Sequence, residues 1–165
     1  MVHPLITQLH FARSEFVRCM TNVPAADAVR RIEPLNCLSW IVGHMAVQEQ
    51  YLWVQLGSGK VIDGDLPKLA GFRQPASTPD WEAMWTVWRE VTAAADVFLA
   101  TISDASLEDH LLSDGKRLRE NIGITLLRNI YHYWHHLGEA HAIRQVLGHR
   151  DLPVFVGSMS DVRVR

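Results

Sequence analysis

Residues 126–140 read LLRNIYHYWHHLGEA, and the main apolar side chains of this stretch are spaced alternately four and three residues apart. The spaced positions are Leu126, Ile130, Tyr133, Leu137 and Ala140. Apolar residues at this spacing lie on one face of an α-helix, and the alternation of four and three is the pattern by which helices pack in a bundle. The stretch therefore predicts a long helix over residues 118–147 that belongs to a bundle and ends at Gly148.

The rest of the chain also has helical periodicity, and no segment shows the sustained alternation of apolar and polar residues that is typical of a strand. The three further helices that we predict lie at residues 4–20, 37–56 and 79–99. Asn36 and Thr78 are the expected N-caps of the last two, and a short helical turn is expected over residues 25–31. The sequence therefore predicts an all-α fold, a four-helix bundle that forms one domain over residues 1–165.

The connection between the second and third predicted helices is unusually long. It spans residues 57–79 and contains three of the seven prolines. Connections between neighbouring helices of a bundle usually have about 2–8 residues. This length indicates either a functional loop or a chain that crosses the end of the bundle to reach a non-adjacent helix.

Composition argues against several classes of function. The chain has 165 residues and a net charge of −2, so it lacks the basic character that is typical of nucleic-acid-binding domains. Its two cysteines, Cys19 and Cys37, form no Cys-x-x-Cys motif and indicate neither redox chemistry nor a disulfide framework. The first residues do not resemble a signal peptide, and no segment approaches a membrane span. We therefore expect a cytoplasmic protein that binds neither nucleic acid nor membrane.

Two histidines of the quoted stretch are spaced as metal ligands. His132 and His136 lie only about 40° apart around a helix and roughly 6 Å apart along it, so they can bind one ion. His135 points about 100° away from His136 and is not chosen as a ligand. Tyr133 stands where His-Glu-x-x-His zinc peptidases have their glutamate, which excludes that class. The chain has nine histidines, so hydrogen-bonded core histidines are the alternative interpretation of the pair.

A third histidine can approach this pair from the second predicted helix. His44 lies at the flank of that helix's apolar face, as His132 and His136 do on the last helix. Three neutral histidines leave one or two coordination positions open, which is typical of catalytic rather than structural sites for zinc and similar metals. Gln48 and Asn129 are the polar side chains best placed to hydrogen-bond a ligand's free ring nitrogen.

Glu49 and Arg144 interrupt the apolar faces of their helices. A carboxylate at the position of Glu49 is costly unless it is paired, so we expect it either to form an ion pair or to orient a ligand histidine. Arg144 interrupts the apolar face of the last helix in the same way and is a candidate partner for a carboxylate. Whether the two meet is left open by the sequence.

Two stretches of the chain resemble a known family. Residues 39–44, SWIVGH, with Glu49 behind them, and the pattern His132-x-x-x-His136-x-Gly138-Glu139 are similar to the DinB/YfiT-like superfamily, and the resemblance spans nearly the whole chain. It implies a four-helix bundle arranged up-down-down-up, with a long crossover between the second and third helices. It also implies that His44, His132 and His136 hold a divalent metal at one end of the bundle.

The resemblance also implies a function. We expect a divalent-metal-dependent enzyme that binds zinc, nickel or iron and acts on a small-molecule substrate. The implied reaction is transfer of a low-molecular-weight thiol to an electrophile, with a related isomerase or hydrolase as a near variant. The alternative belongs to another class: a non-catalytic, stress-related or partner-binding bundle with a structural or vestigial metal site. The apolar tail and the six tryptophans make a homodimer plausible.

Overall fold

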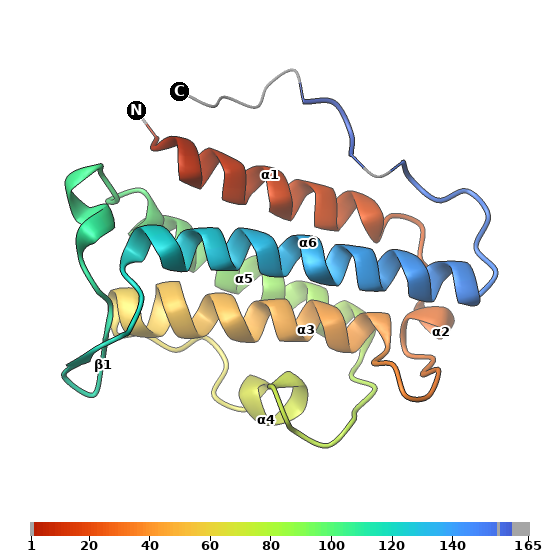
Figure 1. The fold of residues 1–165 in the computed structure, drawn as a ribbon. Helices are drawn as coiled ribbons and strands as arrows, with labels where there is room; N and C mark the ends of the chain where they lie inside the picture. Colours follow the sequence, from red (N-terminus) through yellow and green to blue (C-terminus); the bar gives the residue numbers. More distant parts are fainter. Residues whose placement is uncertain (1, 155, 160–165) are drawn as a thin grey trace.

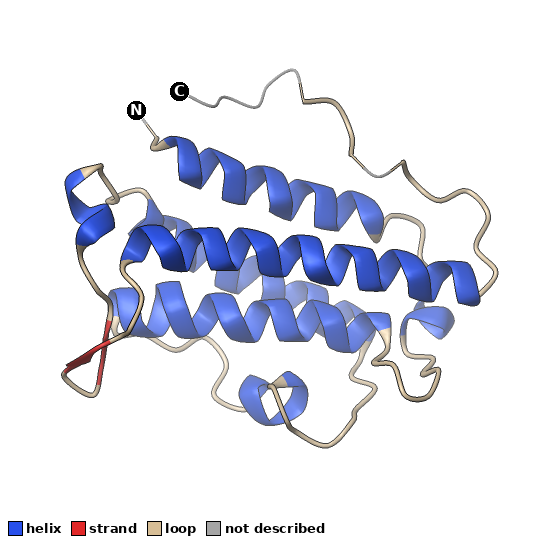
Figure 2. Ribbon diagram, viewed as in Figure 1, coloured by secondary structure: helices blue, strands red, loops and turns tan. Residues whose placement is uncertain are grey.

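The described part of the chain is built from four long helical segments that lie side by side (Figures 1 and 2). The structure is a computed structural model, and it describes residues 2–154 and 156–159. The long segments are α1 (Pro4–Cys19), α3 (Leu38–Glu49) with its π-helical continuation η1 (Gln50–Leu56), α5 (Trp81–Leu99) and α6 (Ile122–Val146). The prediction of a helical fold is confirmed.

The colour gradient in Figure 1 gives the direction of each long helix. In this view α1 and α6 run from left to right, whereas α3 and α5 run from right to left. α1 packs mainly on α6, and α3 packs mainly on α5 with further contacts to α6. Because α3 and α5 run in the same direction, the chain between them has to return along the molecule, and this return contains the short helix α4 (Leu66–Ala70), which lies against α3.

Three short elements complete the connections. Helix α2 (Ala25–Ala28) is shorter than predicted, and the 3₁₀-helix η2 (Ala105–Glu108) follows α5. Strands β1 (Leu112–Ser113) and β2 (Lys116–Arg117) then form an antiparallel hairpin before α6. Its turn residues Asp114 and Gly115 both have positive φ, at 50° and 75°, as a tight Asp-Gly hairpin turn requires. The hairpin was missed because two-residue strands are too short to show alternation.

Three helix starts differ from the predicted ones, in each case because another side chain caps the helix. Asp80 caps α5 by accepting a hydrogen bond from the Ala83 amide at 2.8 Å, so Thr78 is not the cap. Asn121 caps α6, which begins at Ile122, four residues after the predicted start at residue 118. Cys37, not Asn36, caps α3. The predicted stop at Gly148 is confirmed, with φ of +88°.

Helix α3 lies in the middle of the helical packing. Every residue from Leu38 to Ala46 is buried, because α4, α5 and α6 all contact this helix. Gly43 permits the closest approach: a Cβ atom there would lie 2.6 Å from the Met84 sulfur and 3.0 Å from the Ala70 Cβ. Among the described residues, no helix combines the length and the apolar character needed to cross a bilayer.

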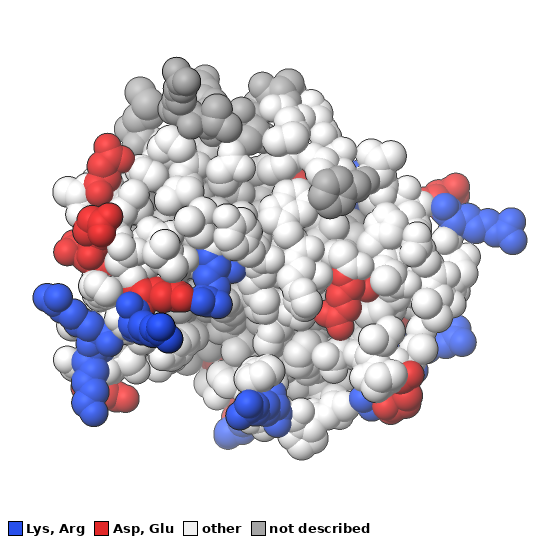
Figure 3. Space-filling view, in the orientation of Figure 1, with Lys and Arg blue, Asp and Glu red and all other residues white. Residues whose placement is uncertain are grey.

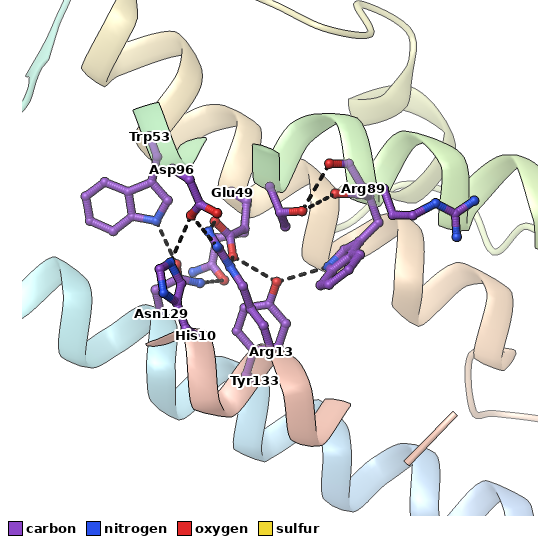
Figure 4. A network of polar contacts seen from close by, with 11 residues as sticks. His10, Arg13, Glu49, Trp53, Arg89, Asp96, Asn129 and Tyr133 are labelled. Carbon is purple, nitrogen blue, oxygen red and sulfur yellow. Dashed lines mark hydrogen bonds and ion pairs between the residues drawn. The ribbon is translucent and has the colours of Figure 1, made fainter. Parts of the chain in front are cut away.

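A buried ion pair joins the helices (Figure 4). Arg13 of α1 donates two hydrogen bonds to the Glu49 carboxylate of α3, at 2.7 and 2.6 Å, and Glu49 is completely buried. Tyr133 of α6 donates to the same carboxylate at 2.8 Å and accepts a hydrogen bond from the Trp88 indole of α5 at 3.0 Å. Burial, and then the Glu49 charge, raise the pKa of Tyr133, so its hydroxyl remains a donor. The network therefore connects all four long helices.

Arg144 does not meet Glu49. Its guanidinium donates instead to the backbone oxygen of Cys19 and to His149 Nδ1. His149 also contacts Asp27 at 3.1 Å, so Arg144 belongs to a separate polar group at the other end of α6. This arginine is satisfied mainly by a carbonyl oxygen, which sequence patterns do not reveal.

We expect Glu49→Ala to lower the free energy of unfolding by about 3–5 kcal/mol, because it leaves the buried Arg13 charge without its bidentate partner. The matched control is Glu120→Ala, which removes an ion pair with Arg128 on the surface. That change should cost no more than about 1 kcal/mol, since solvent screens exposed pairs. Urea denaturation of both variants measures the difference, and equal losses would contradict the role given to Glu49.

Candidate metal centre

The three candidate histidines come together between α3 and α6. His44 is on α3, and His132 and His136 are one turn apart on α6. Their ring centroids lie 5.1 Å apart for His44 and His132, 5.0 Å for His44 and His136, and 4.5 Å for His132 and His136. One nitrogen of each ring lies within 4.8 Å of the other two. The structure thus places three imidazole nitrogens around one point, as the sequence predicts.

Each of these rings is oriented by a hydrogen bond through Nδ1. His44 Nδ1 contacts the backbone oxygen of Ala70 at 2.9 Å, and His136 Nδ1 contacts a carboxylate oxygen of Glu139 at 2.7 Å. His132 Nδ1 contacts the side-chain oxygen of Gln48. All three partners are acceptors, so each Nδ1 carries the proton. In the neutral rings the lone pair is then on Nε2.

These lone pairs suit a cation. His132 Nε2 and His136 Nε2 lie 2.9 Å apart, and two unprotonated nitrogens cannot hydrogen-bond each other. A cation between them removes the repulsion between the lone pairs. Around a tetrahedral Zn²⁺, with Zn–N distances of about 2.0–2.1 Å, ligand nitrogens lie roughly 3.3 Å apart, so small side-chain movements suffice. The donor set therefore fits a divalent ion of the kind that imidazole binds, such as zinc, nickel or iron.

The surroundings keep the rings of His44 and His132 neutral. Burial, followed by the nearby His136 and His44 rings, lowers the pKa of His132 to about 3. Burial also lowers the pKa of His44, whose ring is stacked on Trp40 with centroids 4.5 Å apart and planes 10° from parallel. The hydrogen bond from His136 lowers the pKa of Glu139, which is therefore an ionised acceptor at neutral pH. Neutral imidazoles are the form that binds a metal.

Gln48 and Asn129 lie where the sequence suggested, in a chain of hydrogen bonds that ends at His132. The Trp53 indole donates to the Asn129 side-chain oxygen at 2.7 Å, which leaves the Asn129 amide nitrogen facing Gln48 at 3.5 Å. The Gln48 oxygen consequently faces Asn129 and His132. Gln48 contacts a candidate ligand directly, whereas Asn129 is connected to that ligand only through Gln48.

The structure corrects one of the two expectations for Glu49. Its carboxylate bonds Arg13 and Tyr133, and no contact with a candidate ligand histidine is found for it in the described structure. Figure 4 shows it among Arg13, Tyr133 and Asp96, in the interior of the helical packing. The expected ion pair is present and the alternative, orientation of a histidine, is wrong.

Two partners of the histidines were missed by the sequence reasoning. Glu139 lies three residues after His136, a spacing that places both on one helix face, so a signal was available. Ala70 contributes a backbone oxygen from α4, for which the sequence contains no signal. Both belong to the site, because a hydrogen-bonded Nδ1 fixes the ring that presents Nε2.

A second group of donors shares His136. His135, His136 and Glu139 also bring ligand atoms within 4.8 Å of one another, although His135 is exposed. In that group Glu139 already accepts a hydrogen bond from His136 Nδ1. Within residues 2–154 and 156–159, no cysteine or carboxylate joins His44, His132 and His136 as a fourth donor. The three-histidine group therefore leaves coordination positions for water or a substrate.

The fold and this site define a helical protein with a three-histidine group that could hold a metal ion. A family model described as the DinB superfamily matches residues 8–140, and the chain belongs to that superfamily. No curated protein matches the chain. The family assignment agrees with the resemblance seen in the sequence.

If the three-histidine group binds the ion, then His44→Ala, His132→Ala and His136→Ala should each reduce bound metal from about one ion per chain to well below that, since each removes one of three ligands. His135→Ala is the matched control and should retain the metal. Elemental analysis of untagged protein dialysed against zinc gives the content. Loss of metal in His135→Ala with retention in His44→Ala would instead favour the group that contains Glu139.

We expect Glu139→Ala to keep the fold but weaken zinc binding by about 10–100-fold, because His136 loses the acceptor that orients its ring. Glu90→Ala, an exposed glutamate on α5, is the control and should bind as the unmodified protein does. Competition with a fluorescent zinc chelator measures both affinities. An unchanged affinity in Glu139→Ala would show that its contact with His136 does not support the ring.

Proposed function

We propose that this protein is a divalent-metal-dependent enzyme that transfers a low-molecular-weight thiol to an electrophilic small molecule. The observation that carries the proposal is the convergence of three Nε2 lone pairs with no fourth protein donor in the described structure. A saturated ion would suit a structural role, whereas an ion with open positions can bind a reactant. A hydrolase or isomerase that uses the same three histidines is a near variant.

The same proposal includes the arrangement of the helices. We infer an up-down-down-up four-helix bundle formed by α1, α3 with η1, α5 and α6. The helix directions in Figure 1 and the long connection through α4 support it. This connection matters to the site, because it brings the Ala70 oxygen to His44.

The chain's own cysteines do not provide the nucleophile. Cys19 and Cys37 are both buried, and burial raises the pKa of each thiol. A thiol with a raised pKa is largely protonated at neutral pH and is a poor nucleophile. The attacking sulfur in the proposed reaction therefore comes from a second small molecule.

Each part of the site has a task in the proposed reaction. A divalent ion bound by the three histidines would hold a thiol as its reactive thiolate at neutral pH. Gln48, Glu139 and the Ala70 oxygen keep the three rings fixed, so that the ligand nitrogens do not have to reorganise during the reaction. A hollow of about 480 Å³, lined in part by His132 and Gln48, lies beside the three-histidine group and has the volume of a small-molecule site.

Metal-loaded protein should accelerate the reaction of at least one thiol with 1-chloro-2,4-dinitrobenzene or another electrophile of a small panel, and removal of metal should abolish the acceleration. Cysteine, bacillithiol and mycothiol form the thiol set, and absorbance measures turnover. His44→Ala should be inactive, whereas Glu90→Ala, at an exposed position of α5, should retain activity. Full metal occupancy without metal-dependent turnover across the panel would favour the non-catalytic alternative.

A further inference from the structure

One stripe of α6 faces a hollow instead of the core. It comprises residues spaced three and four apart: Ile124, Leu127, Arg128, Tyr131, His132 and His135. Gln48 of α3 lines the same hollow, whose volume of about 480 Å³ is that of a small-molecule site. Ile124 and Tyr131 are 47% and 63% exposed, which is unusual for large apolar side chains gathered beside a polar site. The stripe therefore has the features of a binding surface that ends at the candidate metal centre.

The only cation that lines this hollow in the described structure is Arg128. Arg128 lies one turn before His132 on α6, and its Nε donates to the Glu120 carboxylate at 2.7 Å. The pair is open to solvent, since the Arg128 side chain is 63% exposed. Arg128 and Gln48 also line a second hollow of about 450 Å³, which includes Glu120. Arg128 therefore lines both hollows.

The charges of this face are unevenly distributed. Figure 3, in the orientation of Figure 1, shows a group of charged side chains toward the left, over the region where α6 begins, and others along the right and lower edges. The lining of the hollow combines the apolar Ile124 and Leu127 with Tyr131 and the Arg128 guanidinium, so a molecule there meets apolar groups and one permanent cation. A planar guanidinium recognises carboxylates through paired hydrogen bonds.

We propose that the hollow binds the electrophilic substrate, that this substrate has an apolar body and a carboxylate, and that Arg128 recognises the carboxylate in place of Glu120. The inference rests on the proposed function for the assignment of the bound molecule as the electrophile. The binding site itself follows from the α6 stripe and from Arg128. In the free protein the Glu120 carboxylate accepts the hydrogen bond of the Arg128 guanidinium, and a substrate carboxylate would take its place.

A second copy of this chain is the competing occupant of an exposed apolar stripe. Three observations favour a small molecule. The stripe is hollowed to the volume of a ligand, it includes a candidate metal ligand at one end, and its cation is paired within the same chain. A stable dimer contact buries about 800 Å² on each partner.

The test uses isothermal titration of the full-length, chelator-treated protein with 2-naphthoate and with its neutral analogue 2-naphthamide. Without metal, the carboxylate has no ion to bind, so its affinity reports on Arg128. We expect 2-naphthoate to bind more tightly than 2-naphthamide. Arg128→Gln should weaken 2-naphthoate binding by about tenfold and change 2-naphthamide binding by less than about twofold. Glu120→Gln should strengthen 2-naphthoate binding severalfold, because it releases the guanidinium.

Arg89→Gln, which changes an exposed arginine of α5, is the control and should leave both affinities unchanged. Equal affinity for the two probes, or an unchanged affinity for 2-naphthoate in Arg128→Gln, would overturn the proposal. So would a dimer in sedimentation that Tyr131→Arg converts to a monomer, since the stripe would then be a subunit interface. Metal content is measured separately on the same variants, so failure of carboxylate recognition is distinguishable from failure of the proposed metal-dependent function.

Discussion

The register of α3 against α6 is fixed by two contacts between consecutive residues, and the candidate site depends on it. Glu49 accepts a hydrogen bond from Tyr133, and the preceding Gln48 contacts the preceding His132. The first contact is completely buried and is secured by the charge of Arg13 from α1. Because neighbouring residues on both helices are used, a shift of either helix by one residue would break both contacts. Glu49 therefore supports the site through the position of α6, by way of its hydrogen bond with Tyr133.

Much of the helical fold could be predicted because it depends on local spacing. The alternation of Leu126, Ile130, Tyr133 and Leu137 predicted α6, and Gly148 predicted its end. The helix starts were harder, because several nearby side chains can cap a helix and tertiary contacts choose among them. The π-helical segment η1 could not be predicted either. The same residue types and apolar spacing are compatible with α- and with π-helical hydrogen bonding, so the sequence predicts only a helix there.

The candidate site was predictable to the extent that it lies on one helix. The spacing of His132 and His136 is a local property, and so is the spacing of His136 and Glu139, although the second was overlooked. The approach of His44 depends on how α3 packs against α6, and residue spacing alone left it uncertain. The Ala70 oxygen depends in addition on the course of the 57–79 connection and on the space left by Gly43. Contacts made by backbone atoms across such distances leave no pattern in residue types.

The orientation of the three rings follows from groups that can only accept or only donate. A backbone carbonyl and an ionised carboxylate can only accept hydrogen bonds. His44 and His136 must therefore carry their ring proton on Nδ1. Gln48 could present either its oxygen or its amide group to His132, and residues beyond Gln48 decide its orientation. The Trp53 indole only donates, which fixes the oxygen of Asn129 toward it and the amide of Asn129 toward Gln48. The Gln48 oxygen must then serve both neighbours, and His132 is left, like the other two rings, with its lone pair on Nε2. The Trp53 indole, whose hydrogen bond goes to Asn129, thus determines which nitrogen His132 offers.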